Sequence, residues 1–255
     1  MQQFISLITL LLATTTTTSI KSMSSLSPPQ YNLRQYQPRD LDGVKTLFRV
    51  NIEEEWGVRY HDGKYIDNAR RYIDSVVSVS APDSDLNNID ETYFQKGGFF
   101  WVLTCSSTGS RNSNTINADA TREEEDDKKE TTTEIIVGTC GLQRISSSVV
   151  ELRRMCIAAN HQSKGWGSRM IQKAIDRAKS NEMMDDDGSG LVEKIIVSTI
   201  EHSIDGISFY KKRHGFIDTI DVETGLPKKV KGVHGTPISE VFMEYNIIKE
   251  NNNTH

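Results

Sequence analysis

The sequence lacks the features that mark several classes of protein. It has only three cysteines among 255 residues, and Cys105, Cys140 and Cys156 form no Cys-x-x-Cys pair, so neither a disulfide framework nor a metal site such as zinc is expected. The formal net charge is -5, and without a clustered excess of Lys and Arg a nucleic-acid partner is not expected. No apolar run approaches the roughly 20 residues of a membrane-spanning helix, so stable membrane insertion is not expected.

The N-terminal segment has no acidic residue before Asp40. An apolar run over residues 4–13 is followed by a stretch rich in Ser and Thr. The run has the length of a secretory signal core, but no Lys or Arg precedes it, and the acid-poor stretch behind it is typical of an organelle transit segment. A disordered extension, with Met23 as a second start, is the alternative. In both cases residues 1–30 lie outside the fold, in a protein of the cytoplasm or of an organelle such as a plastid.

A second low-complexity block covers residues 106–133, with Asn/Ser/Thr repeats and then a run of acidic residues. Such blocks stay solvated and rarely fold. Strand-like segments flank it on both sides, at 98–104 and 134–142, so the block is a disordered acidic insert between neighbouring strands. The rest of the chain, residues 31–250, is expected to form a single domain.

Helical and strand-like patterns alternate through this domain. Apolar residues three and four apart predict helices, and short runs rich in Val, Ile and Phe predict strands. Asp40 is the expected N-cap of the first helix. The expected strands are 31–37, 98–104, 134–142, 148–157, 194–200, 215–220 and 240–247, and the expected helices are 40–51, 64–79, 165–180 and 203–213. A mixed sheet with helices on both faces is the natural packing for this order, which makes the fold class α/β.

The most informative segment lies between the strand at 148–157 and the helix at 165–180. It consists of Gln162, Ser163, Lys164, Gly165, Trp166, Gly167 and Ser168. Paired glycines let the backbone turn tightly and approach a ligand closely. The first N–H groups of a helix lack intrahelical partners, and with the helix dipole they bind phosphate or pyrophosphate. The third glycine of a Rossmann fingerprint and the Gly-Lys-Ser/Thr of a P-loop are both missing, so neither nucleotide motif explains the segment.

The segment resembles the acetyl-coenzyme A motif of the GNAT superfamily of N-acetyltransferases, Gln/Arg-x-x-Gly-x-Gly/Ala, with Gln162, Gly165 and Gly167 at its three defined positions. Downstream, Phe209-Tyr210 and Gly215-Phe216 resemble the helix end of the same family. The resemblance implies a mixed, mainly antiparallel central sheet with helices on both faces. It also implies an acetyl-coenzyme A-dependent N-acetyltransferase, which transfers the acetyl group to a primary amine of a small molecule or protein by direct attack in a ternary complex.

The resemblance also implies roles for individual residues. Backbone groups of Met155, Cys156 and Ile157 contact the pantetheine amides, and residues 162–168 surround the pyrophosphate. Ser203 lies near the coenzyme, where many members have Asn. Tyr210 is the general acid at the thioester sulfur, and Glu151 stands where histone-type members carry their general base.

The chain departs from the family pattern in two places. Gly206 replaces a usual Ala, and one additional residue separates Tyr210 from Gly215. A bulge in the helix end is therefore expected, and such a bulge would reorient Tyr210.

Several alternatives stay open at this stage. Glu151 can be a polar strand residue or a partner of Arg153, Tyr210 a packing aromatic, and Cys156 an acyl-forming nucleophile or, more simply, a buried thiol. The fold also suits a non-catalytic module that binds or senses acyl-coenzyme A.

The sequence carries two conflicting cues about the acceptor. One cue is an acidic run after the first expected helix, formed by Glu53, Glu54 and Glu55 and followed by Trp56. This run either forms a wall of the acceptor site, which would favour a cationic amine, or is a solvated helix face. Basic residues favour an acidic acceptor, and they lie in the expected loop at 225–238: Lys228, Lys229, Lys231 and His234.

Overall fold

The computed structural model describes residues 28–55, 66–79, 81, 84–107, 133–180, 191–231 and 239–247. Most of the expected N-terminal extension and of the acidic insert lies outside the described residues, as do Trp56 and His234. Within the described ranges, no helix combines the length and the apolar character needed to cross a membrane.

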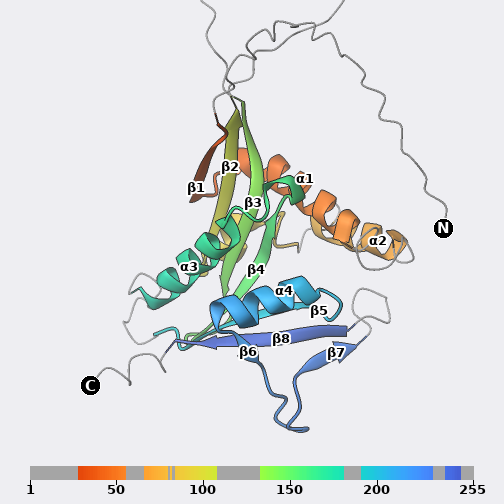
Figure 1. Cartoon of the computed structure of the whole chain (residues 1–255), viewed down its shortest axis with the longest axis vertical. Coiled ribbons are helices and arrows are strands. Elements are labelled where there is room, and N and C mark those ends of the chain that lie inside the picture. Colours follow the sequence, from red (N-terminus) through yellow and green to blue (C-terminus); the bar gives the residue numbers. More distant parts are fainter. Residues whose placement is uncertain are drawn as a thin grey trace, which may run out of the picture.

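The described strands form one eight-stranded sheet, in the order β1-β2-β3-β4-β5-β8-β6, with β7 also paired to β8 (Figure 1). The strands are β1 (Gln30–Gln35), β2 (Phe99–Ser107), β3 (Thr133–Arg144), β4 (Val149–Ile157), β5 (Lys194–Ile200), β6 (Ile217–Asp218), β7 (Lys229–Lys231) and β8 (Ser239–Asn246). Neighbouring strands are antiparallel except β4 and β5, which are parallel. The mixed, mainly antiparallel sheet expected from the sequence is confirmed.

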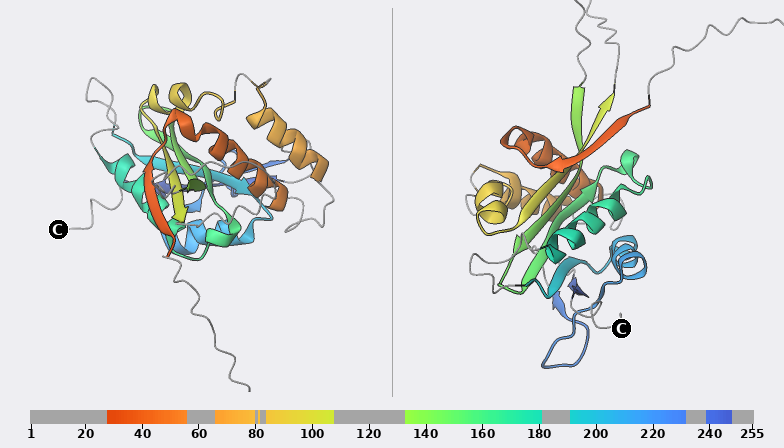
Figure 2. Two further views of the ribbon diagram at one scale, coloured as in Figure 1. Left: turned by 90° about the horizontal axis from the view of Figure 1, so that it is seen from above. Right: turned by 90° about the vertical axis from the view of Figure 1, so that its left-hand side faces the viewer.

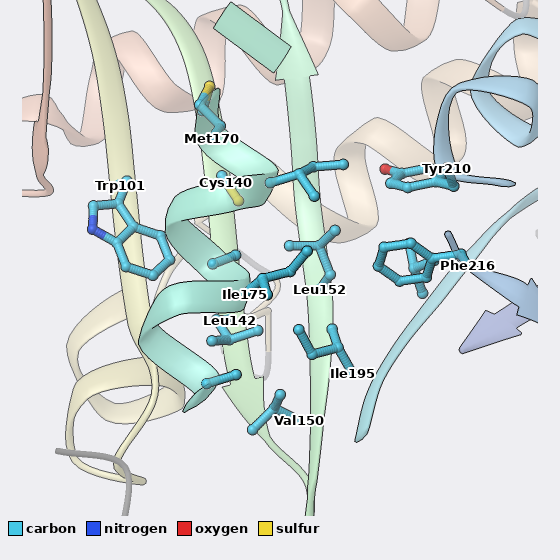
Figure 3. Packing of buried hydrophobic residues seen from close by; sticks show 14 of the residues in the cluster. Trp101, Cys140, Leu142, Val150, Leu152, Met170, Ile175, Ile195, Tyr210 and Phe216 are labelled. Carbon is cyan, nitrogen blue, oxygen red and sulfur yellow. The ribbon is translucent and has the colours of Figure 1, made fainter. Parts of the chain in front are cut away.

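Helices cover both faces of the sheet (Figure 2). The helical segments are η1 (Pro38–Asp40), α1 (Leu41–Ile52), α2 (Ile66–Val77), η3 (Asp90–Phe94), η4 (Ala159–His161), α3 (Trp166–Lys179), α4 (Ile204–Ser208) and η6 (Phe209–Arg213). One hydrophobic cluster joins α1, α2 and η3 to one face, and a second joins α3 and η6 to the other. In the second cluster Met170 and Ile175 of α3 pack with Cys140, Leu142 and Val150 of the sheet (Figure 3).

Two local expectations need correction. Asp40 is the N-cap residue of α1, as expected, but its side chain forms no capping hydrogen bond, because its carboxylate accepts the N–H of Gln37 at 2.8 Å and pairs with Arg34 at 2.6 Å. The segment at 225–238 is not only a loop, since it contains β7. Lys229 of β7 pairs with Glu201 at 3.5 Å, which offsets part of its basic character.

Gly141 leaves the space that a buried aromatic ring fills. A Cβ at this position would lie 2.6 Å from Cε1 of Tyr93 and 3.1 Å from Cδ2 of Phe100. Tyr93 is fully buried, so its ring has no room to withdraw. We predict that Gly141→Ala lowers the free energy of unfolding by about 1–3 kcal/mol, the usual cost of overpacking a core. Urea denaturation measures this, and an unchanged midpoint would contradict the packing described.

Candidate active site

The parallel pair β4–β5 separates partway along its length. Its register begins at Val149 and ends at Leu152, opposite Val197. Beyond that point β4 still pairs with β3, and Ala158 donates its N–H to β3 at 2.9 Å. Because backbone groups of successive strand residues alternate between the two edges, those of Met155 and Ile157 face away from β3. They line a gap between β4 and β5 that no strand of the described chain fills.

A β-bulge in β4 lies where the two strands separate. Arg154 and Met155 together oppose the single residue Cys140 of β3. Arg154 has φ +54°, a left-handed conformation that few residues other than glycine adopt. Thr139 holds the bulge from β3, since its hydroxyl donates to the carbonyl of Arg154 at 2.7 Å. A strained residue of this kind persists only where its surroundings hold it in place.

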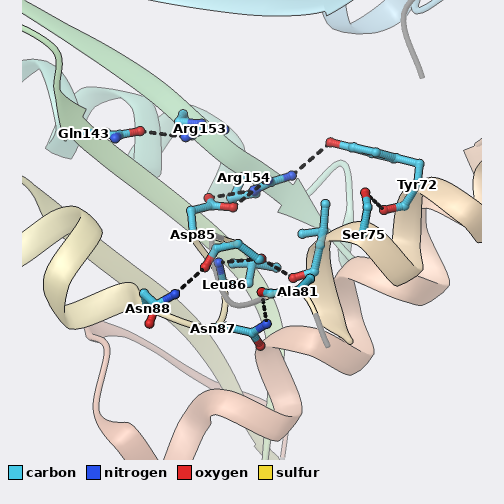
Figure 4. A network of polar contacts seen from close by, with 12 residues as sticks. Tyr72, Ser75, Ala81, Asp85, Leu86, Asn87, Asn88, Gln143, Arg153 and Arg154 are labelled. Carbon is cyan, nitrogen blue, oxygen red and sulfur yellow. Dashed lines mark hydrogen bonds and ion pairs between the residues drawn. The ribbon is translucent and has the colours of Figure 1, made fainter. Parts of the chain in front are cut away.

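The surroundings of Arg154 are a buried polar network (Figure 4). Its guanidinium donates to both carboxylate oxygens of Asp85, at 2.9 and 2.6 Å, and to the hydroxyl of Tyr72 at 3.0 Å. Tyr93 donates its hydroxyl to the same carboxylate at 2.6 Å. Burial alone would raise the pKa of Asp85, but the hydrogen bonds and charge of Arg154 outweigh it and hold this pKa below its ordinary value. The sequence gives no signal for this pair, whose members are 69 positions apart.

The loop at 162–168 leads into α3 and leaves backbone donors open. Ser163 has φ +59° and Gly165 has φ +79°. Arg169 donates its N–H to the carbonyl of Gly165. Among the described residues no acceptor receives the N–H groups of Trp166 and Gly167. A Cβ built on Gly165 would have no atom within 4 Å. An open helix N-terminus of this kind binds phosphate groups.

The side chains of this loop bind mainly to the protein itself. Gln162 donates to the carbonyl of Ile157 at 2.8 Å, so it ties the loop to the end of β4. Lys164 donates to the hydroxyl of Tyr31 at 2.8 Å, and Trp166 packs against the same ring with centroids 5.3 Å apart. Sequence reasoning missed Tyr31, which comes from the edge strand β1. The loop therefore presents its backbone, more than its side chains, to a ligand.

The loop is also attached to the turn that carries Tyr210. Ser168 and His214 hydrogen bond through Oγ and Nε2 at 3.2 Å. A Cβ on Gly167 would approach the ring of Phe209 to 3.0 Å, so glycine allows this close contact. The additional residue before Gly215 is accommodated by the π-helical turn η6. The bulge expected at this helix end is thus confirmed, and such turns often mark functional sites.

Tyr210 is buried, and its hydroxyl points toward β4 (Figure 3). Burial raises the pKa of Tyr210 well above its ordinary value, and the nearby groups Cys140, Glu55 and Cys156 raise it further. The phenol is therefore protonated at neutral pH and able to donate a proton. Its neighbours place it beside the gap between β4 and β5.

Glu151 lies on the other face of the sheet. Val150 and Leu152 belong to the cluster under α3, so the side chain between them points toward the face of α1 and α2. Its carboxylate lies 3.8 Å from Nε of Arg153. Burial raises the pKa of Glu151 above its ordinary value, the charge of Arg153 opposes the shift and Glu240 adds to it. Glu151 and Tyr210 therefore start from opposite faces.

Ser203 stands at the start of α4 and is 5% exposed. Its hydroxyl donates to Glu55, just beyond the end of α1, at 3.1 Å. A Cβ on Gly206 would lie 2.7 Å from that hydroxyl oxygen, which explains why glycine replaces the usual Ala here. The contact with Glu55 joins helices from the two faces of the sheet, and sequence reasoning did not foresee it.

The cysteines of the chain are free thiols. Cys156 contacts the hydroxyl of Thr139 at 3.2 Å, and burial raises the pKa of its thiol to about 11. The thiolate that an acyl-forming nucleophile requires is therefore rare at neutral pH. This favours the buried-thiol interpretation. Among the described residues, no group of His, Cys, Asp and Glu side chains is arranged to hold a metal ion.

The fold and the site together define an α/β protein with an open sheet edge beside a helix N-terminus whose first N–H groups are open. A family model described as an acetyltransferase (GNAT) domain matches residues 124–218. The matched segment includes β4, the loop at 162–168, α3 and the turn that carries Tyr210, so this part of the chain is similar to a GNAT acetyltransferase domain. No curated protein matches the sequence.

Solved structures share the fold at low sequence identity. An acetyltransferase of the GNAT family from Staphylococcus aureus Mu50 has a TM-score of 0.50 and 18% identity, covering 86% of this chain and 99% of its own. The PaiA N-acetyltransferase from Thermoplasma acidophilum, solved in complex with coenzyme A, has a TM-score of 0.51 and 16% identity, covering 85% and 99%. An acetyltransferase from Streptococcus agalactiae 2603 has a TM-score of 0.50 and 13% identity, covering 83% and 96%.

The Asp85–Arg154 pair gives a test of what holds the bulge. We predict that Asp85→Asn lowers the free energy of unfolding by about 3–5 kcal/mol at neutral pH, because it leaves a buried guanidinium without its counter-charge. Asp67→Asn is the matched control, since Asp67 pairs with Arg70 where both side chains are exposed, at 85% and 60%, and such pairs contribute under about 1 kcal/mol. Urea denaturation compares the two variants, and equal losses would contradict this role for the pair.

The same pair predicts a pH dependence of stability. The pKa of Asp85 is lower in the folded than in the unfolded protein, so the pair stabilises the fold above the unfolded-state pKa. This contribution is lost as the pH falls through the folded-state pKa. Wild type should therefore lose more stability between pH 6 and pH 3 than Asp85→Asn does. Parallel losses in the two proteins would contradict the low pKa of Asp85.

Proposed function

We propose that this protein is an acetyl-coenzyme A-dependent N-acetyltransferase acting on a primary amine. The observation that carries the proposal is the continuity of the open β4 edge with the open N-terminus of α3. A pantetheine chain needs backbone partners along its length, and the adjoining pyrophosphate needs anion-binding N–H groups. Both kinds of group occur here in the required order. The neighbour PaiA from T. acidophilum, whose structure contains coenzyme A, supports the proposal by its shared fold.

In this proposal the pyrophosphate lies against the backbone of residues 163–168. Gln162 acts by fixing the loop to Ile157. The pantetheine arm runs along Met155, Cys156 and Ile157, and directs the thioester toward Tyr210 and Ser203. The acceptor amine approaches from the face of α1 and α2, because α3 and η6 cover the other face.

The chemistry requires a neutral amine. A lysine-type amine with pKa near 10.4 is neutral in about one molecule in 2,500 at pH 7, and removing its proton costs roughly 4.6 kcal/mol. An α-amino group with pKa near 8 costs about 1.4 kcal/mol. A base is therefore valuable for the first substrate class, whereas positioning alone can suffice for the second. Glu151 is the base that the resemblance assigns, and burial raises its pKa above its ordinary value, which is the direction that favours a general base.

The departing thiol needs less help. A thiol with pKa near 8.5 leaves readily, so Tyr210 contributes mainly by donating a proton or hydrogen bond to the sulfur as the C–S bond breaks. We therefore expect positioning of the coenzyme to contribute most to the rate, the general base to contribute second and the general acid third.

An amine panel assayed with the full chain and acetyl-coenzyme A tests the proposal. Release of coenzyme A thiol that depends on an added amine is the expected result. Binding of coenzyme A without turnover on any amine would favour a sensing module over an enzyme. Absence of coenzyme A binding would contradict both interpretations.

The backbone site at α3 is tested by a matched pair of substitutions. Gly165 has a left-handed conformation that Asp and Asn tolerate better than most residues, and the space around it is open. We predict that Gly165→Asp weakens coenzyme A binding about 100-fold more than Gly165→Asn does. Like charges about 5 Å apart at a partly screened site repel by roughly 3 kcal/mol. Titration calorimetry measures both affinities, and equal values would argue against a pyrophosphate at this loop.

Tyr210 is tested by removing its hydroxyl. We predict that Tyr210→Phe lowers kcat by about 10- to 100-fold, because a hydrogen bond to a developing thiolate is lost. Since the pKa of Tyr210 is raised, wild type keeps the phenol protonated, and this group causes no fall in kcat between pH 6 and pH 9. Tyr36→Phe, which changes a buried phenol in the cluster of the other face, is the control. A kcat unchanged by Tyr210→Phe across that range would remove Tyr210 from the mechanism.

A further inference from the structure

We infer that Glu55, rather than Glu151, accepts the proton of the attacking amine, with Ser203 holding its carboxylate in place. The inference rests on the proposed function, since it assigns a residue for the same reaction. It follows from where the end of α1 meets the start of α4.

Glu55 comes from one face of the sheet and contacts a residue that belongs with the other. α1 packs in the cluster with α2, whereas α4 leads into η6, whose Tyr210 packs under α3. The 3.1 Å hydrogen bond from Ser203 to Glu55 joins the two. β5 ends at Ile200, three residues before Ser203, so the contact lies beside the end of β5 that has separated from β4.

Ser203 is a well-fixed donor. Its side chain is buried beside Gly206, where no Cβ competes for the space. The carbonyl of Ser203 accepts the N–H of Ile207 at 2.8 Å. A buried hydroxyl on a hydrogen-bonded backbone orients the carboxylate of Glu55, because rotation away would leave the hydroxyl without this acceptor.

The charge of Glu55 affects the pKa values of two groups at the gap, Tyr210 and Cys156. It contributes to the raised pKa of Tyr210 on η6 and to that of Cys156 on β4. A carboxylate that acts on both is near both groups, and the thioester is expected beside them. A general base must lie within hydrogen-bond reach, directly or through one water, of the proton that it removes.

Glu151 is less suited to this step. Besides burial, the largest influences on its pKa are the charges of Arg153, Glu240, Arg154 and Asp85. It also contacts the guanidinium of Arg153 at 3.8 Å. Its position in β4 places it before the bulge, where β4 and β5 are still paired, opposite Ile196. Glu55 instead lies at the open part of the gap.

The step balances as follows. The ammonium group gives one proton to the carboxylate of Glu55, and the freed lone pair forms the N–C bond with the thioester carbon. The C–S bond breaks with its electron pair remaining on sulfur, which takes the proton of Tyr210. The nitrogen gives up its second proton to solvent as the amide forms, the Tyr210 phenolate regains one proton from solvent, and Glu55 releases its own. The products are the amide, coenzyme A and one net proton.

The experiment compares Glu55→Gln with Asp205→Asn, which removes an exposed carboxylate from the first turn of α4. Each full-length variant is assayed with the best amine of the panel and, separately, with hydroxylamine, a small nucleophile already neutral at pH 7. We expect Glu55→Gln to lose at least about 100-fold in kcat on the amine, the usual contribution of a general base, and less than about tenfold on hydroxylamine. Asp205→Asn should match wild type on both. Coenzyme A affinity should be unchanged in both variants.

The difference between the two nucleophiles separates a base from a structural residue. Equal losses of Glu55→Gln on both nucleophiles would overturn the inference, as would wild-type activity on the amine. A loss of kcat on the amine in Glu151→Gln, with no such loss in Glu55→Gln, would also overturn the inference. In each of these cases the proposed function would stand. If the wild-type protein were inactive on every nucleophile, the proposed function itself would be contradicted.

A second variant covers the case in which Glu55→Gln does not fold. Ser203→Ala keeps the carboxylate but removes its donor, and we expect a smaller loss with the same preference for hydroxylamine over the amine. A loss in Ser203→Ala that is equal for both nucleophiles would also overturn the inference.

Discussion

A single buried ion pair, between Arg154 and Asp85, constrains the region on which the site depends. It holds Arg154 in a left-handed conformation that the side chain alone would not favour. That conformation makes the bulge, and the bulge coincides with the point where β4 leaves β5. The open edge along Met155 and Ile157 follows from it. Tyr72, Tyr93 and the segment around Asp85 therefore serve the site without lying in it.

Much of the fold was predictable because its elements have strong local patterns. α3 repeats apolar residues at helical spacing, and β5 is a short run of β-branched residues, so both are recovered within two residues. β7 was missed because its three residues are exposed and carry no apolar alternation. η3 was missed because its wide helical turn has no recognisable sequence signature. Burial against the rest of the chain, more than local preference, determines that segment.

The candidate site likewise has parts that were predicted from the sequence and parts that were not. Its backbone elements, the loop at 162–168 and the turn at Tyr210, carry glycines at fixed spacing and were predicted. The side chains that position them come from remote segments: Asp85 on Arg154, Tyr31 on Lys164 and Glu55 on Ser203. Each contact forms only once the sheet has assembled, so a single sequence contains no local signal for it. Gly206 was noticed as a departure, but its reason appeared only with the position of the Ser203 hydroxyl.

The short pairing of β4 with β5 also has a mechanical consequence. Four residue pairs, from Val149 to Leu152, connect β1–β4 to the rest of the sheet, fewer than in any other pairing except those of the short strands β6 and β7. This connection is therefore a weak point of the hydrogen-bonded sheet. A ligand that contacts both β4 and β5 across the gap would link the two parts of the sheet. A ligand that binds only the folded state stabilises that state by mass action. The coenzyme would then be a structural component of the folded protein as well as a reactant, and each catalytic cycle would tighten and release the two parts of the sheet.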